Sequence, residues 1–375
     1  MHQVMPVRQS PRWKPAVPPG STGAWIGVGW ALVDFAHIMR FAFLVPLCLL
    51  AALVHAPVAA QGQPAPAPPA AGSEPQLTVE SLSVVKVRSK AVSNARSLRT
   101  LGPQREGSGV VIDSEGLVLT IGYLIIESEA VDLVTSDGRS YPATVVGYDN
   151  ATGFGLLRAL RPLPVPPVQM GQSATVADRE LVLIVGYDGV APAYVVSRRQ
   201  FVGYWEYLLD EAIYTAPATV NWSGAALLNR EGRLLGIGSL VVSDAMGAAS
   251  QVPGNLFVPI DLLKPLLGDL LANGRSSARP RPWIGVNTQE VQGNVIVTRV
   301  SSESPAEAAA IRVGDVIVGV AGQPLTGQAD FYNKLWSRGE AGVEILLDVL
   351  REGRVQKVRV KSVDRDSYFR PKPTL

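Results

Sequence analysis

The sequence predicts a mainly β chain, in which an all-β barrel or sandwich is followed by a compact α+β unit. Short β-like runs fill residues 77–262, and turn signals such as Asp113-Ser-Glu-Gly116 and Asn229-Arg-Glu-Gly232 separate them. Many short strands with regular turns are typical of all-β domains. Beyond residue 282, strand-like runs alternate with two helix-like ones, which indicates a separate α+β unit.

In the first region the expected strands are apolar runs that end at turn residues: 109–112, 117–120, 131–134, 181–185 and 234–242. A helix is expected over residues 262–271, with Asp261 as its N-cap and Gly274 as its C-terminal stop. Pro265 would then fall in the first turn, where its missing N–H costs nothing.

In the second region the expected strands are 294–300, 315–320, 343–350 and 355–360, with helices over 304–310 and 328–337 between them. We predict these divisions of the chain: an extension with a signal peptide over 1–60, a Pro/Ala-rich linker over 61–76, a first domain over 77–274, a basic linker over 275–282, a second domain over 283–363, and a disordered tail over 364–375.

Residues 41–60 form an uncharged apolar run that follows Arg40 and ends in small residues. This pattern predicts a signal peptide, with Val58 and Ala60 at the positions that a signal peptidase reads. Export is therefore expected, and Met39 is a natural start that would make residues 1–38 an over-extended gene prediction. An uncleaved anchor remains open, since residues 41–60 are about long enough to span a membrane.

Composition excludes several kinds of function. The chain has 34 Lys and Arg against 32 Asp and Glu, a balance that argues against a nucleic-acid partner. All three histidines (His2, His37, His55) and the single cysteine, Cys48, lie in the first 55 residues. Without the leader the chain has no disulfide, no Cys nucleophile and no imidazole base. We expect no metal and no cofactor.

Residues 80–363 resemble the HtrA-type (DegP-like) periplasmic serine proteases, a family with a trypsin-like double β-barrel followed by a PDZ domain. The resemblance rests on the order and spacing of several motifs: Gly107–Thr120, Gly147–Thr152, Ser223–Gly236 and Val258–Asp261, then Trp283–Val286, Ser304–Ala306 and Gly314–Ile317. It implies the fold of that family and a periplasmic location.

The resemblance also locates the catalytic positions. Ser223 keeps the nucleophile, but Tyr123 stands at the His position and Gly153 at the Asp position. The oxyanion hole would use the N–H groups of Asn221 and Ser223, with Asn221 replacing a glycine. A phenol that titrates near pH ~10 is a poor base at neutral pH. Loss of the histidine alone costs on the order of a millionfold in turnover. A Ser/Lys dyad is the known alternative, but no lysine lies in a motif that would bring it to Ser223.

The PDZ-like part keeps the loop expected to bind peptides, formed by Trp283, Ile284, Gly285 and Val286. In this fold a peptide adds a strand to a sheet edge, and backbone N–H groups capture its terminal carboxylate. Arg279 and Arg281, just upstream, either attract that anion or are solvated linker charges. The second helix is expected to form one wall of the groove. Some of its large side chains, Phe331, Leu335 and Trp336, would line that wall and others would lie in the core.

Three hypotheses follow. The first is an exported, proteolytically inactive homologue that binds peptides, protein C-termini or unfolded envelope proteins as adaptor, scaffold or chaperone. The second is an active serine endopeptidase of envelope protein quality control, which uses Ser223 with a non-standard base. The third is a regulatory subunit that mixes with an active paralogue, since the resemblance implies trimers.

Overall fold

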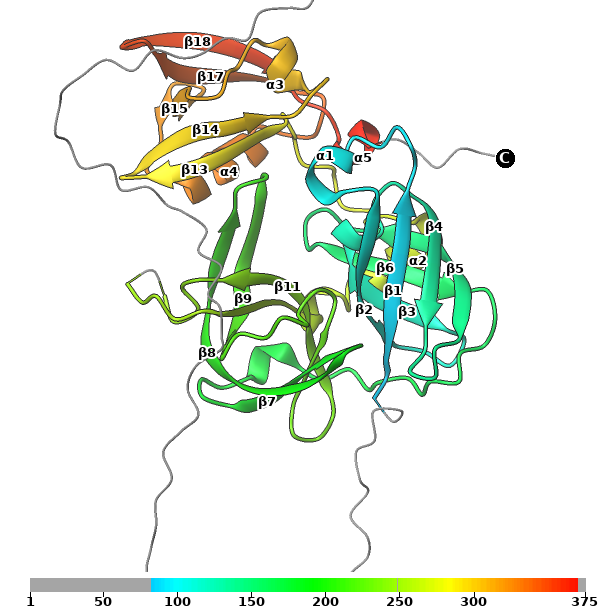
Figure 1. Ribbon diagram of the computed structural model, residues 1–375. Helices are drawn as coiled ribbons and strands as arrows, with labels where there is room; N and C mark the ends of the chain where they lie inside the picture. The colour runs from blue at the N-terminus through cyan, green and yellow to red at the C-terminus, as the bar shows by residue number, and fades with distance from the viewer. Residues whose placement is uncertain (1–81, 248, 370–375) are drawn as a thin grey trace, which may run out of the picture. The chain divides into compact units, whose positions relative to one another are not determined.

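A computed structural model describes residues 82–247 and 249–369 (Figure 1). Strands dominate this part of the chain, and they form two closed barrels and one open sheet. The predicted fold class is therefore confirmed. The predicted signal peptide over 41–60 and the linker over 61–76 lie outside the described residues, as do all three histidines.

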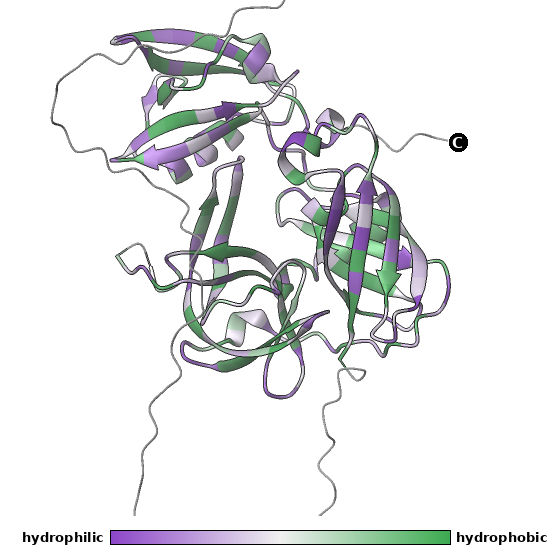
Figure 2. Ribbon diagram, in the orientation of Figure 1, coloured by the Kyte–Doolittle hydropathy of each residue, from purple (hydrophilic) through white to green (hydrophobic). Residues whose placement is uncertain are grey.

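The first barrel closes in the order β1-β2-β3-β6-β5-β4. Its strands are β1 (Val84–Ala91), β2 (Gln104–Val111), β3 (Leu117–Ile121), β4 (Ser128–Val134), β5 (Ser140–Tyr148) and β6 (Phe154–Ala159). Along β1, buried residues alternate with more exposed ones, as the alternating colours in Figure 2 show. Every residue of β3 is buried, so β3 runs through the centre of the packing and carries the segment that follows it into the interior.

The second barrel closes in the order β10-β11-β12-β9-β8-β7. Its strands are β7 (Leu181–Gly186), β8 (Gly189–Gly203), β9 (Tyr207–Ala216), β10 (Ala226–Leu228), β11 (Leu234–Val242) and β12 (Gly254–Pro259). The longest of them, β8, pairs with β9 up to Gly203 and Tyr207, so the two strands form an extended hairpin. Short helices α1 (Leu98–Leu101), η2 (Gly122–Leu124) and η3 (Ser173–Thr175) fill connections.

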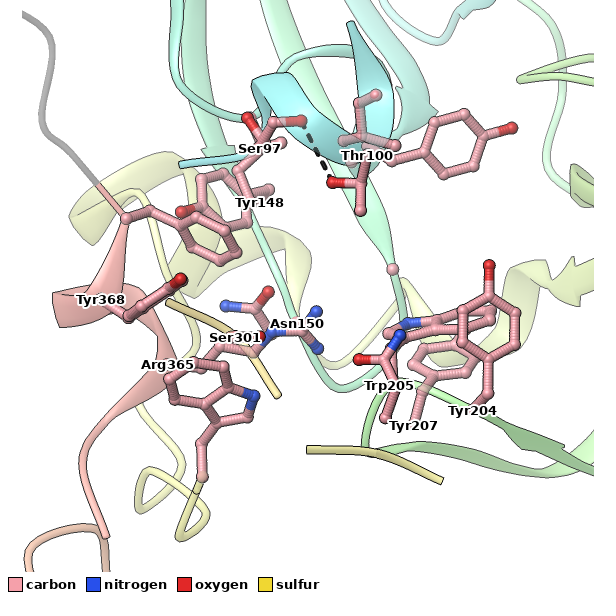
Figure 3. Close-up of a pocket in the computed structure, with 18 of the residues that line it drawn as sticks. Ser97, Thr100, Tyr148, Asn150, Tyr204, Trp205, Tyr207, Ser301, Arg365 and Tyr368 are labelled. Carbon is pink, nitrogen blue, oxygen red and sulfur yellow. Dashed lines mark hydrogen bonds between the residues drawn. The ribbon is translucent and has the colours of Figure 1, made fainter. Parts of the chain in front are cut away.

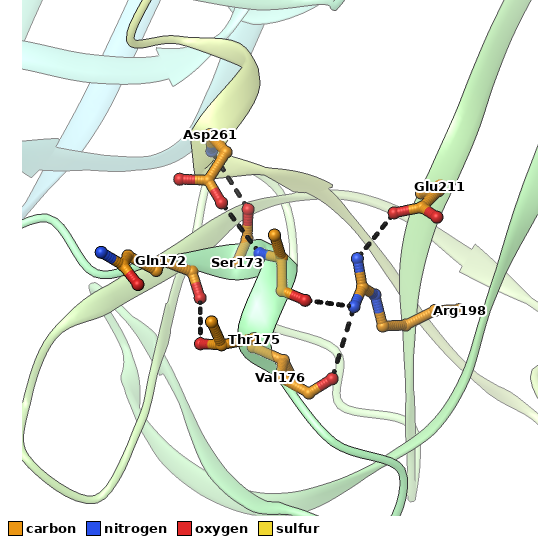
Figure 4. Close-up of polar contacts among 8 residues, drawn as sticks. Gln172, Ser173, Thr175, Val176, Arg198, Glu211 and Asp261 are labelled. Atoms are coloured by element: carbon orange, nitrogen blue, oxygen red, sulfur yellow. Dashed lines mark hydrogen bonds and ion pairs between the residues drawn. The ribbon is translucent and has the colours of Figure 1, made fainter.

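The helix predicted over 262–271 is wrong at its start. The structure has a short helix η4 (Ile260–Leu262), then turns, and then α2 (Leu267–Asn273). Pro265 explains the break, because it lacks an N–H and its ring disfavours a helical residue before it. Asp261 is no N-cap of α2: its carboxylate accepts from the Ala174 N–H of η3 at 2.8 Å (Figure 4). Gly274 does end α2, in a left-handed conformation.

The remaining strands form an open sheet in the order β13-β14-β15-β17-β18, with β16 paired to β15. They are β13 (Val286–Val291), β14 (Asn294–Val300), β15 (Val316–Val320), β16 (Gln323–Pro324), β17 (Glu344–Arg351) and β18 (Arg354–Lys361). Helices α3 (Pro305–Ala308) and α4 (Gln328–Trp336) agree with the two expected helices. Strand β13 lies at one edge of this sheet.

The tail predicted to be disordered is partly ordered. Residues Arg365–Tyr368 form a short helix, α5, which the Asp364 side chain caps. Tyr368 packs on Trp283 with ring centroids 4.4 Å apart, and its hydroxyl donates to the Ser302 carbonyl at 2.8 Å. The aromatic residues of the tail thus have a packing partner that the local sequence does not reveal. In residues 82–247 and 249–369 no helix has both the length and the apolar composition that crossing a membrane requires.

Candidate functional site

Ser223 lies in the loop between β9 and β10, close against β2. Its carbonyl accepts from the Ser108 N–H at 2.8 Å. Gly224, the next residue, has φ +72°, and a Cβ there would overlap the Ser108 carbonyl oxygen. A glycine is required at this point for both reasons. The Ser-Gly pair therefore fixes where the Ser223 side chain stands.

Tyr123 is brought to Ser223 by η2, which directly follows the buried strand β3. The Tyr123 hydroxyl lies 2.8 Å from Ser223 Oγ and 3.1 Å from the Ser239 carbonyl oxygen. A carbonyl only accepts, so both contacts are satisfied when the phenol donates to Ser239 and Ser223 donates to the phenol oxygen. The position expected for the histidine is thus adjacent to the serine, and a phenol occupies it.

The phenol of Tyr123 keeps its own proton at neutral pH. Burial raises its pKa well above the usual value of 10, because the phenolate would lose its solvation, and the bond with Ser223 offsets this only in part. An imidazole would be partly unprotonated at the same pH. The group beside Ser223 is consequently a poor acceptor for the serine proton.

Gly153, at the position expected for the aspartate, belongs to a tight turn. It has φ +84°, and its N–H donates to the Asp149 carbonyl at 2.8 Å. The Asp149 carboxylate accepts from the Thr152 N–H and hydroxyl, both at 2.7 Å, so Asp149 stabilises the turn. A Cβ on Gly153 would lie 3.2 Å from the Tyr207 hydroxyl, which donates to the Thr152 carbonyl at 2.6 Å. Tyr207 therefore fills the space beside Gly153.

Sequence reasoning missed Tyr207, because nothing in the β8–β9 run connects it to a turn some 50 residues earlier in the chain. The backbone of Asn221 does not adopt the left-handed conformation that favours glycine. Its φ is not positive, and its N–H points to the Thr219 hydroxyl at 3.4 Å. The expected oxyanion hole of Asn221 and Ser223 stays a prediction.

The lysines of the described chain are engaged away from Ser223. Five of the six form ion pairs with carboxylates: Lys86 with Glu106, Lys90 with Glu129, Lys264 with Asp261, Lys334 with Asp330, and Lys357 with Asp348. The sixth, Lys361, lies at the end of β18 in the open sheet. Within residues 82–247 and 249–369, the side-chain partner of Ser223 Oγ is Tyr123. The same residues hold no cluster of His, Cys, Asp or Glu that could bind a metal ion.

A cavity of about 350 Å³ opens beside Tyr123 and Trp222. Its wall is rich in aromatic side chains, among them Tyr148, Tyr204, Trp205 and Tyr368 (Figure 3). The rings of Tyr123 and Trp222 are 6.5 Å apart, and both side chains line this cavity.

The predicted peptide-binding loop also has a definite geometry. The N–H groups of Ile284, Gly285 and Val286 donate to one carboxylate, that of Glu206, at 3.2, 2.7 and 3.0 Å. Trp283 differs from the other three predicted residues, because its N–H pairs with the Val363 carbonyl at 3.0 Å. The loop is therefore a nest of donors that holds an anion.

The charged and aromatic residues expected near the loop have defined contacts. Arg279 pairs with Glu340 at 3.1 Å, and Arg281 lies over the Trp336 ring. Phe331 and Leu335 are fully buried core residues. Sequence reasoning missed the polar side of α4, where Gln328 and Tyr332 are buried and hydrogen-bonded.

The comparisons with known proteins agree with this architecture. Residues 107–237 match the family of trypsin-like peptidase domains, and residues 282–362 match the PDZ domain family. HhoA from Synechocystis sp. is 28% identical over 287 residues, which cover 68% of this chain and 70% of HhoA. A DegP-like periplasmic serine endoprotease homologue from Pseudomonas putida is 27% identical over 276 residues, which cover 68% of this chain.

The aligned region spans only 55% of that Pseudomonas protein, so the chain corresponds to about half of it. A solved structure of the HtrA-type protease AlgW with a decapeptide covers 78% of this chain and 97% of AlgW, at 21% sequence identity and a TM-score of 0.46.

Proposed function

Since the chain belongs to the HtrA-type family of trypsin-like serine protease homologues with a PDZ domain, we propose that it is a non-proteolytic member of that family. Its role is to bind peptides, protein C-termini or unfolded envelope proteins through the PDZ domain, as an adaptor, scaffold or chaperone.

One observation carries this proposal: the hydroxyl next to Ser223 Oγ is the phenol of Tyr123, at 2.8 Å. A serine needs an adjacent base to become a nucleophile. A phenol with a raised pKa does not supply that base. Gly153 offers no carboxylate that could orient one.

Turnover of unfolded casein by the purified chain tests the proposal. We expect no cleavage above background, and the same result for Ser223→Ala. Cleavage by the wild type that Ser223→Ala abolishes would overturn it. A parallel assay measures binding: the chain should slow the aggregation of a heat-unfolded client, and Ser223→Ala should do so equally well.

The peptide-binding role is supported by the nest of three N–H groups at residues 284–286, which already holds a carboxylate. Such a nest captures a peptide's terminal carboxylate, while the edge strand β13 accepts the peptide backbone. A valine at position 285 should abolish capture, because Gly285 has φ +89° and packs against Ser304.

The relatives from Pseudomonas putida and Haemophilus influenzae are named as probable periplasmic proteins, and the proposed location of this chain is the periplasm. N-terminal sequencing of the native protein should give Gln61 as the first residue. A start within residues 1–40 would instead favour the anchored form.

Two alternatives are separable by experiment. Because Ser223 is retained in its loop, an endopeptidase with a non-standard base is the second candidate, and it requires that Ser223 react with an active-site probe. A regulatory subunit in a trimer with an active paralogue requires that the two proteins co-purify from native cells.

A further inference from the structure

The tip of the β8–β9 hairpin lies in the groove between β13 and α4. The Thr288 N–H on β13 donates to the Tyr204 carbonyl at 2.8 Å. From α4, the Tyr332 hydroxyl and the Gln328 side-chain amide donate to the Gly203 carbonyl at 2.8 and 3.2 Å. The hairpin tip is therefore bonded to both walls of the groove.

The tip runs along β13 as an added peptide would. Tyr204 is bonded to Thr288, and the next contact, from Glu206, is made at Val286, so the two segments are antiparallel. Strand β13 is an edge of its sheet, so the Thr288 N–H bonds the hairpin tip instead of a neighbouring strand. The tip thus points its Glu206 end toward the loop of residues 284–286, in the direction of a peptide's C-terminus.

The Glu206 carboxylate completes this arrangement. One of its oxygens accepts from Gly285 and Val286, and the other accepts from Ile284. Only 5% of the residue is exposed. Three hydrogen bonds from backbone N–H groups thus converge on this one side chain, and they offset part of the cost of burying it. The positive charge of Arg365, on α5, also acts on this carboxylate.

The groove is built to hold the tip. Thr288 and Tyr332 are fully buried, and their hydroxyl groups are 3.0 Å apart. Gln328 donates to the Thr288 carbonyl at 2.9 Å as well as to the hairpin. The hairpin is stiffened by Trp205, which stacks on Tyr207 at 5.3 Å. A stiff tip loses little conformational entropy when it enters the groove.

The backbone at Glu206 is strained, which favours a specific use of its side chain. Its φ of +55° lies in the left-handed region, which is unfavourable for a non-glycine residue. Glycine at this position would remove the strain but also the carboxylate. The three hydrogen bonds to the loop offset that cost.

We propose that the hairpin tip is an internal ligand of the PDZ domain, and that the Glu206 carboxylate takes the place of a peptide's terminal carboxylate. This inference rests on the proposed peptide-binding function. A peptide with a free C-terminus binds only after it displaces the tip, so the intact chain is closed until such a competitor arrives.

Hydrogen exchange at the amides of residues 284–286, measured on the full chain, tests the closure without any peptide. We expect exchange at these amides to be about tenfold or more faster in Glu206→Gly, since the variant loses the three hydrogen bonds that protect them. Glycine suits the backbone at this position, so the variant should fold. Glu206→Gln keeps the length of the side chain and should give an intermediate rate. Equal rates in the wild type and Glu206→Gly would overturn the inference.

Glu211→Gln is the matched control, because Glu211 lies on β9 of the same hairpin, is exposed and pairs with Arg198 on β8 (Figure 4). It removes the same charge without touching the groove, and exchange at residues 284–286 should stay at the wild-type rate. Faster exchange in this control would also count against the inference, because it would attribute the effect to hairpin charge alone.

Capture of fluorescein-labelled random peptides then tests the peptide-binding function and the internal ligand separately. Peptides with free C-termini are compared with peptides whose C-termini are amidated. If Glu206→Gly captures more of the peptides with free C-termini than the wild type does, both the peptide-binding function and the internal ligand are supported. Equal, carboxylate-dependent capture by both proteins keeps the proposed function and overturns the internal ligand. Fast exchange in the variant with no capture by either protein supports the closure and removes the peptide-binding function.

Discussion

The Tyr123 hydroxyl lies 2.8 Å from Ser223 Oγ and also reaches the Ser239 carbonyl. The hydrogen-bond partner of the serine hydroxyl is therefore a phenol that stays protonated at neutral pH. The hairpin that carries Tyr207 beside Gly153 also carries Glu206 into the PDZ groove. One hairpin therefore contacts both the turn at Gly153 and the loop of residues 284–286.

Tyr123→Phe should lower the free energy of unfolding by about 1–2 kcal/mol, because two buried hydrogen bonds are lost. No proteolysis should appear. Thermal unfolding measures the first effect and casein turnover the second. Tyr194→Phe is the control, since that side chain is 52% exposed and its change should leave the unfolding temperature unaltered. Casein cleavage by Tyr123→Phe would mean that the phenol masks a working site.

Gly224→Ala should destabilise the chain far more than Gly232→Ala. Both glycines have nearly the same left-handed φ, +72° and +73°. A Cβ at Gly224 would overlap the Ser108 carbonyl oxygen, whereas nothing lies within 4 Å of one at Gly232. We expect about 1 kcal/mol at Gly232, from the backbone alone, and several times that at Gly224. Similar unfolding temperatures for the two variants would show that the Ser223 loop is not packed as described.

Asp315→Asn should destabilise the PDZ domain by about 3 kcal/mol, because it breaks a buried ion pair. Both Asp315 oxygens accept from Arg351, at 2.7 and 2.6 Å, and the Asp315 side chain is 2% exposed. Desolvation raises the pKa of Asp315, but the Arg351 bond, the Arg312 N–H bond and the charges of both arginines together outweigh it and leave the pKa low. Glu344→Gln breaks the exposed pair with Arg359 instead and should change unfolding by less than about 1 kcal/mol.

The fold could be predicted largely because it depends on local signals. Alternating apolar runs and Gly or Asp turns located seven of the nine strands expected by residue range to within one residue, as at Leu234–Val242. The start of α2 was missed because a single proline outweighed an otherwise helical run. The catalytic and loop positions came from the resemblance to the HtrA-type family. Their partners, Tyr207 and Glu206, did not, since they depend on a long-range contact of the β8–β9 hairpin that no local pattern encodes.

Closure of the PDZ groove should weaken as the pH rises. Burial raises the pKa of Glu206 from 4.5 to about 7 in the closed state, despite the three N–H bonds and the charge of Arg365. The neighbouring Tyr332 stays neutral, because burial raises its pKa too. The protonated form of Glu206 therefore stabilises the closed state fully below pH 4.5. This stabilisation is lost as the pH rises through 7.

Hydrogen exchange at residues 284–286, corrected for its intrinsic pH dependence, should show opening that increases on the order of 100-fold across this window. Glu206→Gly should show no such increase. An opening constant that is independent of pH in the wild type would exclude Glu206 as the titrating group.

The central claim is that Ser223 is not an activated nucleophile. Intact-mass analysis of the purified chain after incubation with a fluorophosphonate probe at neutral pH measures this directly, with trypsin as the positive control. The account predicts an unmodified mass for the wild type and for Ser223→Ala alike. A probe adduct on Ser223 of the wild type, absent from Ser223→Ala, would contradict it.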